Sequence, residues 1–216
     1  MRRLRPATVD LCVPFREKDL AKNLGAIWSP DRKTWFIPIA RNFARFERWL
    51  PPKPKFSIRA TSYFINRESQ TCWSCGRATT VYALSVPARH EVLVPVDDDD
   101  LPFTDLCDYE LWQNSAASVQ WLVCRSPSYL AYIEDLVPGV RGALESAIPL
   151  FYRDYSKQAN MKYWMNHCEH CRAKKGDWNL HNEPGGAFFR LPDDLHDIWR
   201  HIDMIIYANA SSTTDF

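Results

Sequence analysis

The chain contains two copies of one short pattern, Cys72-Trp73-Ser74-Cys75 and Cys168-Glu169-His170-Cys171. Two residues separate the thiols of each copy, a spacing that lets a tight turn direct both sulfurs at one metal ion. Two such turns supply the four thiolates that Zn²⁺ prefers in closed structural sites. We therefore expect one structural zinc ion per chain, bound by Cys72, Cys75, Cys168 and Cys171, with no open position for a reactive water.

The segment between the two patterns, Gly76 to His167, is 92 residues long, whereas a compact zinc finger has ~12–20 residues there. The metal is therefore expected to join segments that lie far apart in sequence, with a folded insertion between them. Disulfides or a redox-active pair are the alternatives, but the sequence indicates neither an oxidising compartment nor a thioredoxin-like βαβ pattern. His167 and His170 adjoin the second pattern, yet four thiols already complete the site.

The bulk composition is that of a globular protein that can bury a core. The chain has 216 residues, 46% of them hydrophobic and 25% charged, and no run approaches the ~18–20 apolar residues of a membrane span. Seven cysteines leave at least one thiol free, and Cys12, Cys107 and Cys124 read as ordinary buried cysteines. A reducing cytoplasm is the expected location, and neither a membrane association nor a small-molecule cofactor is expected.

The charge is divided unevenly along the chain. Residues 1–60 carry 14 Lys/Arg and 5 Asp/Glu, a net charge of +9, whereas residues 61–216 carry 13 and 21, a net charge of −8. Such a division is typical of a basic module that meets an acidic partner, or of two halves that attract each other. The four aspartates at 97–100 belong to the acidic part and are expected in a solvated loop.

The first 50 residues are predicted to form a small strand–helix–hairpin–helix module. The expected elements are a strand at 9–13, a helix at 16–24 ended by Gly25, a hairpin made of 26–28 and 34–37, and a helix at 43–50 with Phe43, Phe46, Trp49 and Leu50 inward. Residues 51–56, Pro-Pro-Lys-Pro-Lys-Phe, form a stiff Pro/Lys linker.

Within this module, Val13-Pro14-Phe15…Glu17-Lys18…Ala21-Lys22…Leu24-Gly25-Ala26…Trp28…Lys33…Trp35…Ile37-Pro38 resembles a small bacterial domain of unknown function. That family is similar to modules on plasmid primase-like and other DNA-processing proteins. The resemblance implies a nucleic-acid context and supplies no catalytic residue. The stretch at 163–177, taken with residues 72–75, also resembles uncharacterised bacterial proteins that pair a split four-cysteine zinc site with this same module.

Positive and aromatic side chains of the module are the candidate nucleic-acid contacts. Lys and Arg neutralise phosphates, and exposed Trp rings stack on unpaired bases. Trp side chains also fill the cores of small modules, and the cations also suit plain solvation or docking to the acidic half, so these readings stay open. The candidates are Arg16, Lys18, Lys22, Arg32, Lys33, Arg41, Arg45, Trp28 and Trp35.

Residues 57–216 are predicted to form a zinc-ribbon-like β domain with a helical insertion at about 101–155. Strands are expected at 56–66, 79–86, 92–96 and the end of 152–166, and helices at 108–122 and 140–148. A last helix is expected from Pro192, with Leu195, Ile198, Trp199, Ile202, Ile205 and Ile206 as its apolar stripe. The cations Arg172, Lys174 and Lys175 are expected to offset the charge of the metal–thiolate unit, with phosphate binding as the alternative.

No catalytic motif is present, since the sequence lacks a phosphate-binding glycine loop, a Gly-x-Ser-x-Gly elbow, a His-Glu-x-x-His pair and a deaminase pattern. We expect an α+β protein that is zinc-stabilised, cytoplasmic and bound to nucleic acid through its basic module, with no catalytic residues. The alternatives are a protein–protein adaptor without nucleic-acid binding, and a metal-dependent nuclease built from Asp177, His181 and Glu183.

Overall fold

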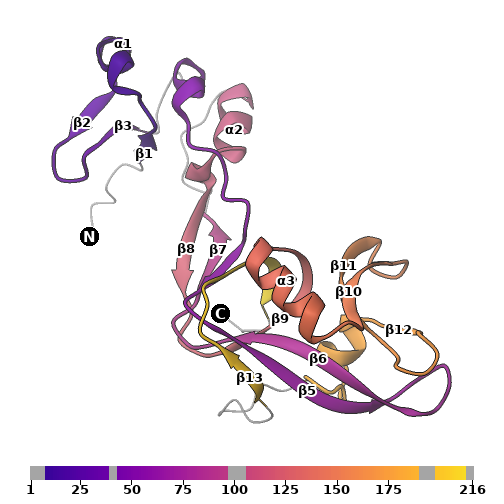
Figure 1. The fold of residues 1–216 in the computed structure, drawn as a ribbon. Helices are drawn as coiled ribbons and strands as arrows, with labels where there is room; N and C mark the ends of the chain where they lie inside the picture. Colours follow the sequence, from indigo (N-terminus) through magenta and orange to yellow (C-terminus); the bar gives the residue numbers. More distant parts are fainter. Residues whose placement is uncertain (1–7, 39–42, 97–105, 190–197, 213–216) are drawn as a thin grey trace, which may run out of the picture. The chain divides into compact units, whose positions relative to one another are not determined.

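The computed structural model describes residues 8–38, 43–96, 106–189 and 198–212 (Figure 1). It divides into two compact units, one made of residues 1–54 and 94–120, the other of residues 55–93 and 121–216. Among the described residues there are fourteen strands but only three α-helices, and every strand pairing is antiparallel. The chain is therefore mostly β, and the predicted α+β class is wrong. None of the helices in this described part is long and apolar enough to cross a membrane.

The first unit begins with a three-stranded sheet in the order β1-β3-β2. Its side chains alternate between a core face and an outer face, since Val9 and Leu11 are buried while Thr8 and Asp10 are exposed. The elements in chain order are β1 (Thr8–Leu11), the 3₁₀ turn η1 (Phe15–Glu17), α1 (Lys18–Asn23), β2 (Ile27–Ser29), β3 (Thr34–Pro38), the 3₁₀ helix η2 (Phe43–Trp49), α2 (Leu106–Gln113) and the 3₁₀ turn η3 (Ala116–Ser118).

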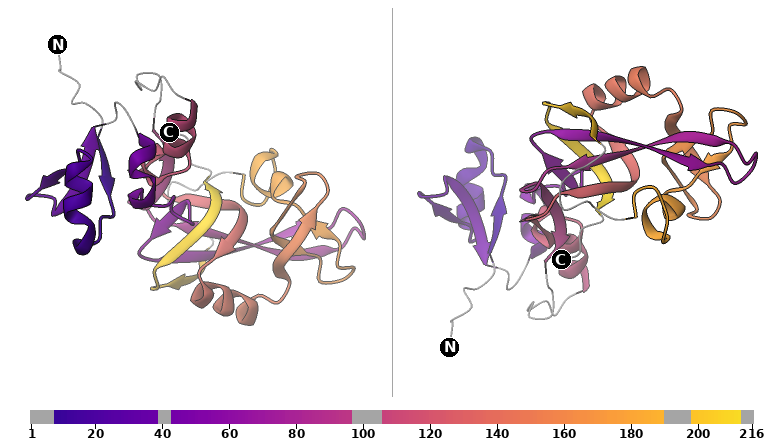
Figure 2. Two further views of the ribbon diagram at one scale, coloured as in Figure 1. Left: turned by 90° about the horizontal axis from the view of Figure 1, so that it is seen from above. Right: turned by 90° about the horizontal axis from the view of Figure 1, so that it is seen from below.

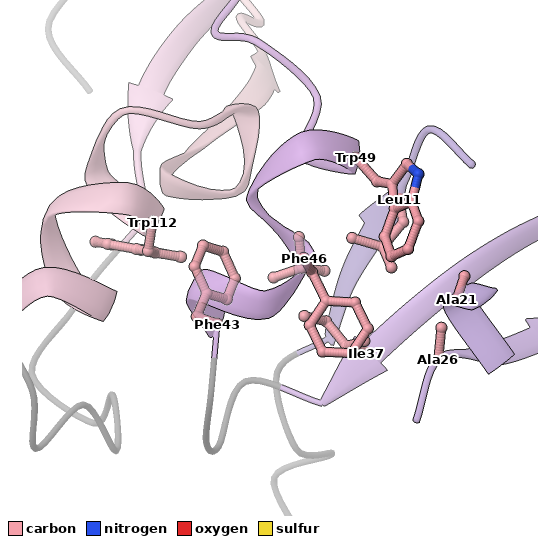
Figure 3. Packing of buried hydrophobic residues seen from close by; sticks show 9 residues of the cluster. Leu11, Ala21, Ala26, Ile37, Phe43, Phe46, Trp49 and Trp112 are labelled. Carbon is pink, nitrogen blue, oxygen red and sulfur yellow. The ribbon is translucent and has the colours of Figure 1, made fainter. Parts of the chain in front are cut away.

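The core of this unit lies between the sheet and η2. Leu11 and Ile37 of the sheet pack with Phe46 and Trp49, and Phe43 faces Trp112 of α2 (Figure 3). Phe43, Phe46 and Trp49 are buried as predicted. The segment that carries them is a 3₁₀ helix and not the expected helix, so the unit contains less α-helix than the sequence pattern indicated.

Two motif residues of the module have local structural roles. Glu17 accepts a hydrogen bond from the indole nitrogen of the buried Trp49 (Nε1–Oε2 2.7 Å) and also pairs with Arg48. Gly25 has φ +106°, and its N–H donates to the carbonyl of Lys22 (3.0 Å). A residue with a side chain would be strained in that left-handed conformation, so glycine ends α1 there.

The second unit is built on an eight-stranded sheet in the order β13-β5-β6-β9-β14-β4-β7-β8, beside a three-stranded sheet in the order β10-β11-β12. The strands are β4 (Ile58–Ala60), β5 (Tyr63–Thr71), β6 (Ala78–Val86), β7 (Glu91–Pro95), β8 (Val119–Val123), β9 (Ser128–Leu136), β10 (Phe151–Ser156), β11 (Met161–His167), β12 (Lys174–Lys175), β13 (Ile198–Ile202) and β14 (Ile206–Ser212). The helices are α3 (Pro138–Ala147) and the π-helical turn η4 (Trp178–Asn182).

The predicted last helix is the clearest error. Ile198, Trp199 and Ile202 lie in β13, which pairs with β5, and Ile206 begins β14, which pairs with β4 and β9. Ile205 lies in the connection between them, and Leu195 lies outside the described residues. The isoleucines recur at helical spacing, but β-branched side chains favour strands, and pairing with three other strands outweighs the local pattern.

The predicted helical insertion contains strands as well as helices. Residues 108–122 are helical only to Gln113, and β8 starts at Val119. The nine-residue strand β9 and the strand β10 occupy much of the remainder. The helix predicted at 140–148 is confirmed as α3, because Val140 and Leu144 form a buried apolar stripe.

Candidate metal centre

Each Cys-x-x-Cys pattern forms the turn at the tip of an antiparallel hairpin. Cys72 and Cys75 connect β5 to β6, and Cys168 and Cys171 connect β11 to β12. The β5–β6 ribbon is long and twisted, and it runs out to the three-stranded sheet that carries the second turn (Figures 1 and 2). The two hairpins thus bring together two pairs of cysteines that are almost a hundred residues apart in the sequence.

The two turns share one backbone geometry. In the first turn the N–H of Cys72 donates to Arg77 and the N–H of Gly76 donates back to Cys72 (2.8 and 2.9 Å). In the second turn the N–H of Cys168 donates to the carbonyl of Ala173, and the N–H of Arg172 donates to the carbonyl of Cys168 (both 3.0 Å). The residue after each second cysteine has a positive φ, +70° at Gly76 and +61° at Arg172, so the second turn adopts the left-handed conformation without a glycine.

The four sulfur atoms lie at metal-binding separations. Cys72 Sγ is 3.7 Å from Cys171 Sγ, Cys75 Sγ is 3.8 Å from Cys168 Sγ, and all four atoms lie within 4.8 Å of one another. Four sulfurs about 2.3 Å from a central Zn²⁺ would be about 3.8 Å apart in a regular tetrahedron. Among the described residues this is the only group of three or more Cys, His, Asp or Glu side chains whose ligand atoms converge. The four cysteines are thus close enough to hold a metal ion.

The thiols differ in burial and in acidity. Cys72 and Cys168 are buried, whereas Cys75 and Cys171 are exposed. Burial raises the pKa of Cys168, but the N–H groups of Cys171 and His170 and hydrogen bonds from other thiols lower it to about 6. The N–H of Arg77 lowers the pKa of Cys75, yet burial and hydrogen bonds with the other three thiols raise it to about 11. A cation is therefore needed before all four thiols ionise together near neutral pH.

Hydrogen bonds outside the cysteines also join the two turns. Glu169 donates its N–H to the Thr79 hydroxyl (3.0 Å) and accepts from the N–H of Thr80 (3.0 Å). His170 contacts the carbonyl of Ala78 through Nε2 (2.9 Å), and the indole of Trp73 donates to the carbonyl of Lys174 (2.9 Å). These contacts orient the turns relative to each other.

The histidine next to the second pattern, His167, makes contacts of its own outside the thiol group. His167 is buried, stacks on Tyr152 with ring centroids 3.8 Å apart, and lies 3.2 Å from Asp154 through Nε2. Neither His167 nor His170 belongs to the group of converging ligand atoms. The converging group consists of the four thiols alone.

Two lysines follow the second turn. Lys175 is buried, and its ammonium donates to the carbonyl of Thr71 (2.9 Å); burial lowers its pKa, whereas the charges of the thiolates raise it. Lys174 pairs with Asp154 (3.0 Å), and its hydrogen bond lowers the pKa of that carboxyl group to about 2. A buried ammonium beside four thiolates fits the expected charge compensation. Arg172 is exposed.

The residues of the nuclease alternative do not form one site. Asp177 is buried and accepts a hydrogen bond from the N–H of Tyr132 (2.7 Å). His181 is buried among aromatic rings, including Tyr129 (ring centroids 5.7 Å apart). Glu183 is exposed. In the described part of the chain these three side chains form no converging ligand group.

The candidate nucleic-acid residues are spread over the first unit, on η1, α1, β2, β3, η2 and the turn between β2 and β3. Arg16 pairs with Glu17 (3.6 Å) and Arg32 with Asp10 (2.6 Å). Those that make no ion pair within the described residues are Lys18, Lys22, Lys33 and Arg45. Lys18 lies over the exposed ring of Phe15 (4.2 Å from the centroid). Arg41 lies outside the described residues.

The two candidate tryptophans differ in exposure. Trp35 faces the core side of the sheet and is partly buried against the core cluster. Trp28 lies opposite it on the edge strand, with ring centroids 5.6 Å apart, and is 46% exposed. The outer face carries another aromatic ring that the sequence did not single out, Phe36, covered by the guanidinium of Arg32 (4.7 Å). Phe36 directly follows Trp35 in a strand, and successive side chains of a strand point to opposite faces, so the sequence could have placed Phe36 on the outer face.

Comparisons with known proteins match only part of this chain. The family described as "Domain of unknown function (DUF5710)" matches residues 8–51. Two curated proteins, each described as DNA primase TraC from Escherichia coli, are 38% identical over 93 residues (43% of this chain) and 40% identical over 45 residues (21% of this chain). The chain spans only 6% and 4% of the length of these relatives. No solved structure matches. Residues 8–51 therefore form a DUF5710 domain, joined in this chain to a domain that gathers four cysteines at metal-binding distance.

Proposed function

We propose that this chain is a zinc-stabilised nucleic-acid-binding protein whose basic first 60 residues contact phosphates. The observation that carries the proposal is the similarity of this chain to proteins described as DNA primases, together with its DUF5710 domain. The zinc assignment is supported by the four thiols, because a tetrahedral set of sulfur ligands suits Zn²⁺.

The distribution of charge supports the same proposal. Residues 8–51 contain eight Lys/Arg and five Asp/Glu, and residues 1–7 and 52–60 add three cations each and no acid. Within the domain, Lys18, Lys22, Lys33 and Arg45 have no carboxylate partner among the described residues. Lys55 and Arg59 instead pair with Asp135 and Glu91 (2.7 and 2.6 Å). The cations available for phosphate are therefore those of the domain and of the preceding segment.

Salt dependence tests this proposal. If about four to six phosphates are neutralised, log Kobs should fall with log[salt] at a slope of roughly −3 to −5 for duplex or single strands. Changing Lys18, Lys22, Lys33 and Arg45 to Gln should remove about three to four units of that slope. The measurement is fluorescence anisotropy with labelled single-stranded DNA, duplex DNA and RNA at several salt concentrations.

A matched control uses four exposed cations of the second unit, changed to Gln in the same way: Arg77, Arg125, Arg153 and Lys162. This variant has the same loss of net charge, so it should keep nearly the full slope if the contacts lie on the DUF5710 domain. If both variants lost the same amount of slope, the loss would reflect net charge alone, and the assignment of the interface to the DUF5710 domain would be refuted. Absence of binding by the wild-type chain at low salt would refute the proposed function.

A further inference from the structure

A cavity of about 640 Å³ lies beside the metal centre, within the second unit. Its walls come from the first cysteine turn, the turn between β10 and β11, strand β12, and the loop after η4. The volume falls in the range of ~300–1,000 Å³ that is typical of ligand sites. Neither the metal centre nor the DUF5710 domain accounts for this cavity.

One wall is an exposed aromatic ring that is fixed in place. Trp73 is 74% exposed, yet its indole N–H donates to the carbonyl of Lys174 at 2.9 Å. Tyr155, also on the wall and 39% exposed, is held through its hydroxyl by Asn160 (2.6 Å). Rigid rings that face solvent beside a cavity are suited to stacking on another planar group.

The cavity is also lined by hydrogen-bond donors that the protein does not fully use. Lys175 is only 6% exposed, and Thr71 is its only hydrogen-bond partner among the described residues, although an ammonium group has three donors. Lys157 and Lys174 add two more cations to the lining, of which Lys174 is also paired with Asp154 (3.0 Å). A buried ammonium with donors to spare indicates a ligand that carries acceptor oxygens.

The remaining lining groups suit the edge of a nucleobase. The side-chain amides of Gln70, Gln158 and Asn179 each offer a donor and an acceptor. The opposite wall is fixed by Gly186, since a Cβ atom there would lie 2.6 Å from the carbonyl oxygens of Asn179 and Leu180. A side chain at this position would push the wall out of place, so the backbone itself borders the cavity.

We infer that this cavity binds one unpaired nucleotide of a nucleic acid strand, with its base stacked on Trp73 and its phosphate near Lys157, Lys174 and Lys175. The inference rests on the proposal that the chain binds nucleic acid, and it adds a second contact site in a different unit. Stacked rings, amides and a few cations are the combination that recognises single strands. A duplex does not offer an unstacked base, so single strands are the expected partner.

The charge count sets the character of the site. Three lysines and the single carboxylate of Glu183 line the cavity, so the site neutralises at most about two phosphates. Its own contribution to the salt slope is then no more than about −1.4 for a single strand. Binding here depends on stacking, and salt should affect it much less than it affects the DUF5710 interface.

Photochemical crosslinking tests the inference on the full wild-type chain. A single-stranded oligonucleotide of about eight residues with 5-iododeoxyuridine at each position in turn is irradiated with the protein, and the adducts are mapped by mass spectrometry. We expect adducts at Trp73 or Tyr155, and competition by unlabelled strand. Adducts confined to residues 8–51 would overturn the inference and leave the proposed function intact. Adducts at Trp73 that persist in the four-Gln variant of the domain would support the cavity as a contact site separate from the domain.

Substitutions give the quantitative test. Trp73→Ala should weaken single-strand binding about 5- to 150-fold, while Trp73→Phe should keep most of the affinity. Trp178→Ala is the matched control, because Trp178 is 49% exposed in the same unit and does not line this cavity. A free mononucleotide, dTMP, serves as a competitor: displacement of the strand from Trp73 at millimolar dTMP shows that one nucleotide suffices. Wild-type affinity in Trp73→Ala would overturn the inference.

Discussion

Removing one cysteine should change the metal coordination in a way that the structure specifies. A regular tetrahedron with edges of 3.7–3.8 Å, the two measured Sγ–Sγ distances, has its centre about 2.3 Å from each corner. We therefore predict one metal ion per chain with four sulfur neighbours at about 2.3 Å. In Cys75→Ser the shell should contain three sulfurs and one lighter atom, and metal affinity should fall by more than the ~10–100-fold that loss of an outer hydrogen bond costs.

X-ray absorption at the zinc edge measures both the distance and the number of sulfur neighbours, and elemental analysis of the same sample gives the stoichiometry. Cys12→Ser is the control, because Cys12 is exposed and lies outside the ligand group. Its spectrum should match that of the wild type. Four sulfurs retained in Cys75→Ser, or a wild-type shell that includes nitrogen ligands, would show that the assignment of the four thiols is wrong.

Three further predictions concern stability. Burial raises the pKa of Asp177 to about 7 and lowers that of His181 to about 4; between about pH 4 and 6.5 the folded state then holds a proton on Asp177 that the unfolded state has lost, and lacks one on His181 that the unfolded state binds. These opposite effects on the pH dependence of stability cancel in the wild type. In Asp177→Asn only the effect of His181 remains, so the unfolding free energy should rise by about 1.4 kcal/mol per pH unit relative to wild type in this window. Unfolding free energies from urea titrations that change with pH in the same way for both proteins would contradict this. Glu17→Ala leaves the buried indole N–H of Trp49 without its acceptor and should cost about 1–3 kcal/mol in urea unfolding, whereas Glu17→Gln, which keeps an acceptor oxygen, should cost much less. Gly186→Ala should destabilise by roughly 1–3 kcal/mol because its Cβ would meet two carbonyl oxygens, while Gly142→Ala in α3, which meets nothing within 4 Å, should stabilise by up to about 1 kcal/mol; equal values for the two glycines would refute the close approach.

The parts of the site that depend on local chemistry were predictable from the sequence. The Cys-x-x-Cys spacing specifies a turn with two sulfurs on one side, and the strands before and after the first turn follow from residues with β propensity at 79–86. The sequence could not indicate that Arg172 adopts φ +61°, because arginine has no preference for that conformation. The second turn repeats the backbone hydrogen bonds of the first, and Arg172 takes the same left-handed conformation as Gly76.

The errors arose where strand pairing over long distances overrides local periodicity. At 198–206, Ile198, Ile202 and Ile206 are spaced by four residues, which fits one face of a helix. In the fold Ile198 and Ile202 pair with β5, and Ile206 pairs with β4. A strand that reads as a helix is recognised only when its partners are known, and those partners lie more than 100 residues earlier.

The cavity could not be predicted from the sequence for a related reason, since its lining residues come from five separate segments between Gln70 and Gly186. The four converging cysteines bring two of those segments together. Trp73 lies within one cysteine turn, and Lys174 and Lys175 directly follow the other. Outside the cysteines, the tips of the two hairpins are joined by a few hydrogen bonds: those of the exposed Glu169 and His170, that of Trp73 with Lys174, and that of the buried Lys175 with Thr71. Single hydrogen bonds of this kind contribute only about 1 kcal/mol each in water. Loss of the metal should therefore loosen the contact between Trp73 and the lysines while the eight-stranded sheet, with its own buried core, stays folded. The metal centre would in this way control nucleotide binding in the cavity without contacting the nucleotide.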